Sequence, residues 1–181
     1  RMNPYTSLWT GPTPGDGPAP ELVICGGPSG NGAQLPDQLR ADAARLGVAD
    51  RTHFLPPLDR VDLVALFRAA TVVAVPSYSE SFGLVAVEAQ ASGAPVVAAD
   101  VGGLSTVVAD GHSGLLVAGH RVQVWRDALA TVLDQPRLRD RLAAGARRQA
   151  ERFSWDATTA ETLRAYGAAL ERADVDHRRW A

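Results

Sequence analysis

Short apolar runs alternate along this chain with longer segments of helical spacing. The apolar runs have the length and β-branched content of buried strands, and they lie at 21–25, 52–55, 71–76, 94–99 and 114–117. Segments whose apolar residues have helical spacing lie at 37–46, 59–70, 82–92, 122–133, 136–153 and 155–173. A helical turn is expected at 105–109. Because such strands are apolar on both faces, the pattern predicts βαβ units around a parallel sheet, which is an α/β, Rossmann-like fold.

The same pattern divides the chain into three parts. Residues 1–20 are rich in proline, glycine and threonine, and they are predicted to be irregular. Residues 21–153 carry the alternating strands and helices and form one Rossmann-like domain. Residues 154–181 form a C-terminal helix and tail.

A parallel sheet binds its ligands at the carboxyl ends of its strands. In this chain the loops at those ends are 26–32, 56–60, 76–83, 100–104 and 118–121, and three of them are rich in glycine. The candidate site is therefore expected along this edge of the sheet.

Residues 77–93 are the most informative stretch at this edge, with Glu80 before Gly83 and Glu88 within the following apolar helix. Free backbone N–H groups at a helix start favour an anion, and carboxylates accept hydrogen bonds from vicinal hydroxyls of a ribose or a hexose. The plainer alternatives are a helix-start acid for Glu80 and an internal ion pair for Glu88. The helix is expected to be buried, so Glu88 should need a partner.

Two further glycine-rich loops are less specific. The adjacent Gly102 and Gly103 fit either a close approach of the backbone to a ligand or a plain turn. The loop at 26–30 has neither Gly-x-Gly-x-x-Gly nor Gly-Lys-Ser/Thr, so a dehydrogenase-type dinucleotide site and a P-loop are both unsupported.

The composition argues against several kinds of site and partner. The net charge is −2 and all 18 basic residues are arginine, which gives no support to nucleic-acid binding and removes lysine chemistry. The single Cys25 excludes an internal disulfide and is predicted to be buried at a strand end. The four histidines lack metal-ligand spacing, and each is expected to be a surface or structural residue. No apolar run reaches the roughly 20 residues of a membrane span, and a cytoplasmic location is expected.

These residues resemble a known family. Glu80 and Glu88 are separated by seven residues, and Ala-Gln-Ala-Ser-Gly-Ala-Pro-Val-Val-Ala and Val-Gly-Gly-Leu follow them. This cluster resembles the C-terminal donor domain of retaining glycosyltransferases of family four, which have the GT-B fold, and the likeness runs from about 21 to 153. The strings at 24–30, 79–86 and 114–120 resemble members that transfer N-acetylglucosamine from UDP-N-acetylglucosamine to 1D-myo-inositol 3-phosphate in mycothiol biosynthesis.

The resemblance implies roles at matching positions. Glu88 would hold the ribose hydroxyls of UDP, and the main chain near Leu58 would meet the uracil. Glu80, the candidate catalytic residue, would bind the donor sugar rather than act as a nucleophile, and the reaction would be a front-side substitution. The backbone beside the sugar and diphosphate would be that of Ser81, Phe82, Gly83 and Leu84.

The resemblance also implies a metal position. No essential cofactor is expected, but a related enzyme carries Mg²⁺ near the segment that matches Phe67, Arg68 and Ala70. The residue that completes this site is often threonine, and here it is Ala94.

The departures from the family concern the start of the chain. Nothing before residue 21 matches the family's first strand, its Gly-Arg loop or the lysine that neutralises the diphosphate, and the N-terminal acceptor domain has no counterpart here. We therefore expect this segment alone not to turn over. A family-four transferase with a lipid or polysaccharide acceptor, and a non-catalytic nucleotide-binding fragment, remain alternatives. No nucleic-acid partner and no membrane span are expected, and a homodimer is left open.

Overall fold

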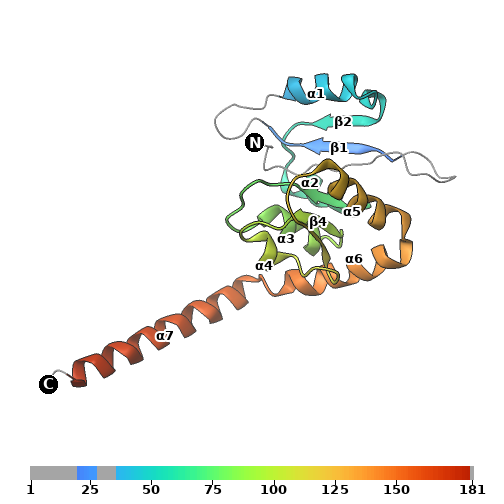
Figure 1. Cartoon of the computed structure of the whole chain (residues 1–181). Coiled ribbons are helices and arrows are strands. Elements are labelled where there is room, and N and C mark those ends of the chain that lie inside the picture. The colour runs from blue at the N-terminus through green and yellow to red at the C-terminus, as the bar shows by residue number, and fades with distance from the viewer. Residues whose placement is uncertain (1–19, 28–35, 180–181) are drawn as a thin grey trace. The chain divides into compact units, whose positions relative to one another are not determined.

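The computed structural model describes residues 20–27 and 36–179, with side chains up to residue 172. Strands and helices alternate along the chain (Figure 1). They are β1 (Leu22–Cys25), α1 (Pro36–Arg45), the 3₁₀ turn η1 (Ala49–Arg51), β2 (Thr52–Leu55), α2 (Arg60–Ala69), β3 (Val73–Val75), α3 (Leu84–Ala91), β4 (Val96–Ala99), α4 (Leu104–Val107), β5 (Gly114–Val117), α5 (Val122–Asp134), α6 (Pro136–Glu151) and α7 (Trp155–Arg179). The predicted α/β fold is confirmed. The turn η1 was not predicted from the sequence.

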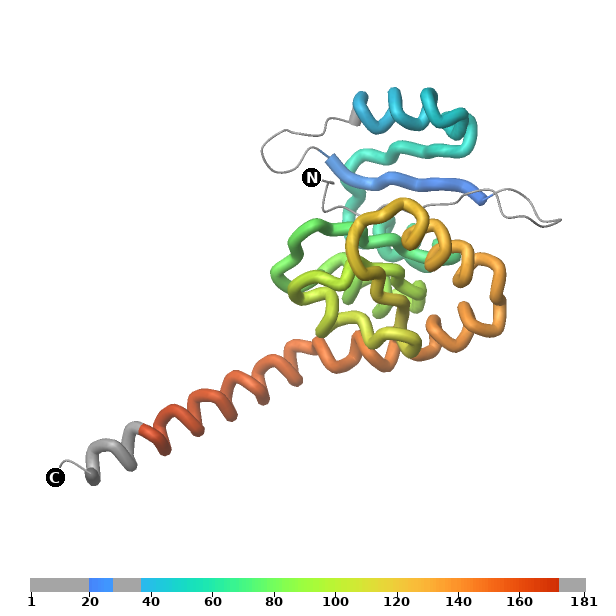
Figure 2. The backbone as a smooth tube through the Cα atoms, in the orientation of Figure 1, coloured from blue at the N-terminus to red at the C-terminus, as the bar shows by residue number. Residues whose placement is uncertain are grey.

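All strand pairs between these elements are parallel. β1 pairs with β2, with Leu22 opposite Thr52. β4 lies between β3 and β5, with Val96 opposite both Val73 and Gly114. The described strands thus form a pair and a triplet, and each chain passage from strand to strand runs through helical segments (Figure 2).

Local sequence signals explain where the helices begin. The Asp59 carboxylate accepts a hydrogen bond from the Asp62 backbone N–H, which caps α2. Pro136 occupies the first position of α6, where the missing N–H of proline costs nothing. The Ser154 hydroxyl accepts from the Ala157 N–H at the start of α7. These caps place the helix boundaries close to those predicted from the apolar pattern.

The core lies on the β3–β4–β5 triplet. Alternate residues of these strands face α5 and α6 because successive side chains of a strand point to opposite faces. The buried cluster on that face contains Val72, Ala74, Val97, Val117, Leu129, Val132 and Leu142. The triplet is therefore the rigid base from which the loops at its carboxyl edge project.

The chain divides into two compact units, residues 1–150 and 151–181. The second unit is essentially α7, and none of its described side chains is buried. Its exposed large apolar side chains are Trp155, Leu163, Tyr166 and Leu170.

Within the described residues, every helix is too short or too polar to cross a bilayer.

Candidate functional site

Three of the loops predicted at the carboxyl edge meet at that edge. The Gly103 N–H, after β4, donates to the Glu80 carbonyl after β3 over 3.0 Å. The His120 ring, after β5, bonds the Ser77 carbonyl over 3.1 Å. Residues 77–83, which we call the donor loop, are thus held between the loops that follow β4 and β5.

Glu80 is half-buried at the centre of the donor loop. Its carboxylate accepts a hydrogen bond from the Phe82 backbone N–H, with a donor-to-acceptor distance of 3.4 Å. A Cβ built on Gly83 would lie 3.8 Å from Glu80 Cγ, so the side chain lies against the residue that precedes α3. This contact is consistent with the plainer reading of Glu80 as a helix-start acid, and it also leaves one carboxylate oxygen for a ligand hydroxyl.

The first turn of α3 has no side-chain cap. Gly83 is its N-cap and has a left-handed backbone, with φ of +99°. A Cβ at this position would lie 2.8 Å from Leu104 Cδ2, so glycine is required by conformation and by space. The uncapped N–H groups and the helix dipole together favour an anion at this point, as the sequence predicted.

The sequence predicts that α3 is buried and that Glu88 therefore has a partner, and for one face of the helix this prediction is wrong. Its buried residues are Ala86, Ala89 and Gln90, whereas Leu84 and Glu88 lie one turn apart on an exposed face. No ion pair recorded among the described residues involves Glu88. The carboxylate therefore needs no internal partner, because water solvates it, and it is accessible to a ligand.

The buried polar residue of α3 is Gln90 instead. Its amide donates to the carbonyls of Ala86 and Val107, both at 3.2 Å. Gln149 of α6 donates to the same Val107 carbonyl. These bonds satisfy the last carbonyl of the short helix α4, which would otherwise be unpaired in the core.

The glycine pair after β4 forms a turn, which is one of its two predicted readings: the Leu104 N–H donates to the Val101 carbonyl over 3.2 Å. A Cβ on Gly102 would lie 2.0 Å from the Glu80 carbonyl oxygen, and a Cβ on Gly103 would lie 2.5 Å from Phe82 Cα. Both glycines are therefore required by a close approach of the donor loop's own backbone. This loop-to-loop contact places Glu80 relative to β4.

The loop that the resemblance assigns to uracil is anchored to β1 through Cys25. The Cys25 thiol donates to the Pro56 carbonyl over 3.4 Å. Burial raises the pKa of this thiol, and a hydrogen bond with the Leu58 backbone opposes that shift. Cys25 is buried at a strand end, as predicted, and it holds the Leu58 segment in place. The glycine-rich continuation at 28–32 lies outside the described residues.

Residues 14–149 match the family described as glycosyl transferases group 1. The chain belongs to this family.

Similar proteins agree with that membership. A D-inositol 3-phosphate glycosyltransferase of Stackebrandtia nassauensis is 56% identical over 163 residues, which are 90% of this chain and 37% of that protein. Sucrose-phosphate synthase from Thermosynechococcus elongatus has the same fold, with a TM-score of 0.71, 30% identity, and coverage of 83% of this chain and 38% of that one. Anabaena HepE, solved with UDP and glucose, has a TM-score of 0.69 and 28% identity, over 82% of this chain and 40% of that one.

The chain thus spans well under half the length of these group 1 glycosyltransferases and their structural relatives. The matched part has the GT-B-like α/β architecture predicted from the sequence. The resemblance to family-four glycosyltransferases is confirmed at the level of family and fold.

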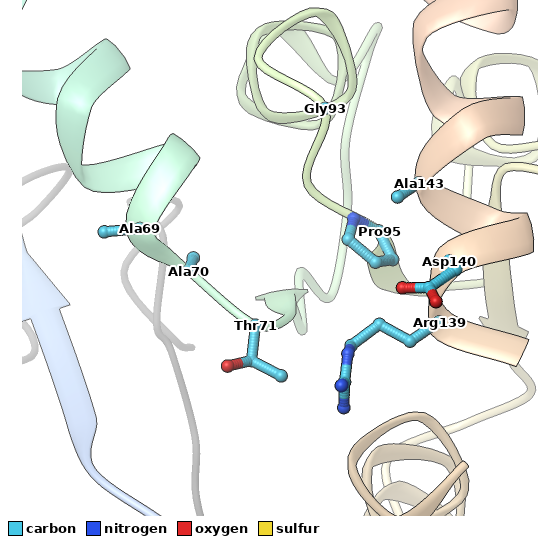
Figure 3. Close-up of a pocket in the computed structure, with 8 residues that line it drawn as sticks. All are labelled: Ala69, Ala70, Thr71, Gly93, Pro95, Arg139, Asp140 and Ala143. Atoms are coloured by element: carbon cyan, nitrogen blue, oxygen red, sulfur yellow. The ribbon is translucent and has the colours of Figure 1, made fainter. Parts of the chain in front are cut away.

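The metal position implied by the resemblance lies elsewhere on the domain. A hollow of about 320 Å³ opens beside the residues that precede β3 and β4, and Figure 3 shows its lining residues. Its lining residues are Ala69, Ala70, Thr71, Gly93, Pro95, Arg139, Asp140 and Ala143.

The residues at this position do not fit Mg²⁺. The Phe67 carbonyl already accepts from the Ala70 N–H, and Arg68 and Ala70 would contribute only further main-chain oxygens. Position 94 offers a methyl group, and the Arg139 guanidinium lines the same hollow. Mg²⁺ takes a nearly complete octahedron of oxygens. The Asp140 carboxylate lines the hollow too, but the neighbouring Arg139 guanidinium is a cation and opposes a second cation there. The function proposed below uses no metal.

Sequence reasoning missed two members of the site. The sequence predicts only a surface or structural position for His120, and it indicates no role for Tyr78. In the structure their rings are stacked, with centroids 3.9 Å apart and planes 11° from parallel. Their positions in the sequence could have indicated both residues, because His120 lies in the predicted edge loop 118–121 and Tyr78 lies two residues before Glu80.

Proposed function

We propose that this chain is the donor-binding part of a retaining glycosyltransferase. It would bind UDP-N-acetylglucosamine for transfer to 1D-myo-inositol 3-phosphate. The observation that carries the proposal is the uncapped start of α3 at the carboxyl edge, with Glu80 immediately before it and Glu88 on the exposed face of the same helix. The high identity to proteins named D-inositol 3-phosphate glycosyltransferase supports the acceptor.

Each part of the donor has a suitable counterpart. The diphosphate would meet the N–H groups at the start of α3, where the helix dipole is positive. Glu80 would accept hydrogen bonds from sugar hydroxyls, and Glu88 from the two ribose hydroxyls. The main chain near Leu58 would meet the uracil.

Transfer would proceed by front-side substitution. The bond from the anomeric carbon to the diphosphate oxygen breaks, its electron pair leaves with UDP, and the acceptor oxygen bonds to the same face. Backbone N–H groups that stabilise the departing charge lower the barrier. The chain has no lysine to add to them, so we expect no turnover by this segment alone. The acceptor domain, a cytoplasmic location and a homodimer stay predictions.

Calorimetry with UDP and with UDP-N-acetylglucosamine tests the proposal. We expect Glu88→Gln to weaken UDP binding by about tenfold to a hundredfold, because hydrogen bonds to a charged group contribute about 1.5 to 3 kcal/mol. We expect Glu80→Gln to leave UDP binding nearly unchanged and to remove the extra affinity that the sugar provides.

Asp134→Asn is the matched control, since it removes one exposed carboxylate at the far end of α5. It should change neither affinity. Folded wild-type protein that binds no UDP would contradict the proposal and favour a non-catalytic remnant. Binding of UDP with a preference for a lipid or polysaccharide acceptor in the complete enzyme would favour the second alternative.

A further inference from the structure

We propose that His120 is a positioning residue that determines where the donor loop presents Glu80. The inference rests on the proposed function, because it assigns Glu80 to the donor sugar. It goes beyond that function by assigning a role to the loop after β5. The two contacts that carry it join residues 43 positions apart in the sequence.

The first contact is a hydrogen bond with a defined direction. His120 Nε2 lies 3.1 Å from the Ser77 carbonyl oxygen. A carbonyl can only accept, so Nε2 must carry the hydrogen. The bond therefore selects one ring tautomer, and it fixes the first residue of the donor loop, whose side chain is buried.

The second contact is the stack of His120 on Tyr78. Tyr78 remains 55% exposed, so this pair is not part of the buried core. The stack restrains Tyr78, which lies between Ser77 and the segment that bears Glu80. Nearly parallel rings at this separation give a favourable contact that depends on orientation.

His120 is itself held by the domain core. The Trp125 indole N–H of α5 donates to the Gly119 carbonyl over 3.0 Å. Trp125 packs against the buried cluster beneath β3, β4 and β5. A continuous path of contacts therefore leads from α5 through residue 119 and His120 to the donor loop.

This path reaches Glu80 but not Glu88. Glu88 is placed by α3, whose Ala86, Ala89 and Gln90 are anchored in the core. Loss of His120 should consequently disturb the sugar contact and spare the ribose contact. That separation distinguishes a positioning role from a general loss of stability.

The test compares wild-type protein with His120→Ala, His120→Gln and the control His112→Ala. Gln carries an amide N–H that can replace the Nε2 donor, whereas the His112 ring bonds the nearby Asp110 carbonyl. Amide hydrogen exchange over residues 77–83 is measured without ligand. Affinities for UDP and UDP-N-acetylglucosamine are measured by calorimetry.

We expect His120→Ala to speed exchange in the donor loop by about tenfold and to weaken UDP-N-acetylglucosamine binding by about tenfold, with UDP binding changed less than about twofold. His120→Gln should recover most of both losses, and His112→Ala should match wild type. Unchanged exchange in His120→Ala, or equal loss of affinity for the two ligands, would overturn the inference. If wild-type protein binds neither ligand, the proposed function fails, while the exchange result still decides whether His120 positions the loop.

Discussion

Gly102→Ala is expected to lower the free energy of unfolding by about 3 to 5 kcal/mol, the largest loss for any single methyl group added at the candidate site. Gly102 has φ of +51°, where an L side chain is strained, and the new Cβ would lie 2.0 Å from the Glu80 carbonyl oxygen. The contact is with backbone, so no side-chain rotation can relieve it. The loop after β4 and the donor loop must separate, and donor binding should be lost with stability.

Urea denaturation and UDP calorimetry measure this effect, and Gly111→Ala is the matched control. Gly111 also has a left-handed backbone, with φ of +70°, but its Cβ would enter open space. Gly111→Ala should lower the free energy of unfolding by only about 1 to 2 kcal/mol, which is the cost of holding an L side chain in a left-handed conformation. It should leave UDP binding intact. Equal losses of unfolding free energy in the two variants would show that the close contact with Glu80 contributes nothing to the destabilisation of Gly102→Ala.

Gly145→Ala is expected to destabilise the protein by about 2 to 4 kcal/mol, although this change normally stabilises a helix interior by up to about 1 kcal/mol. Gly145 lies within α6, and a Cβ there would lie 1.8 Å from the His112 carbonyl oxygen. The turn before β5 packs directly on the helix backbone at this point. Denaturant unfolding of the variant measures the loss.

Gly167→Ala, in α7, is not expected to destabilise the protein. A Cβ at Gly167 meets nothing within 4 Å, so helix propensity alone should decide the outcome. Helical content measured by circular dichroism should stay the same or rise slightly. The interpretation of Gly145 would be wrong if both substitutions changed stability in the same direction.

The strands and most helix boundaries could be predicted from the sequence because they depend on local signals. The strands Thr52–Leu55 and Gly114–Val117 coincide with the apolar runs that predicted them. Proline at 136 and aspartate at 59 mark helix starts through bonds to residues nearby in the chain. The motif around Glu80 and Glu88 was likewise enough to indicate the family, since its spacing is a property of one continuous segment.

The exposure of Glu88 could not be predicted in this way. An apolar run of helical length is compatible with burial on one face or on all faces, and only packing against β3 and β4 selects the buried face. The same limit applied to Gly102 and Gly103. Their pattern indicated a close approach, but the partner is the backbone of Glu80 and Phe82, about twenty positions earlier in the chain.

Local pattern was therefore sufficient to predict the fold class and the family and to select Glu80 and Glu88 as candidates, because each depends on the order of neighbouring residues. The arrangement of the site was decided by tertiary contacts. His120 touches Ser77 and Tyr78 only because parallel strands bring the loops after β3 and β5 to the same edge. Long-range contacts of this kind leave no periodic signal in either segment, so the position of Glu80 emerges only when the sheet is assembled.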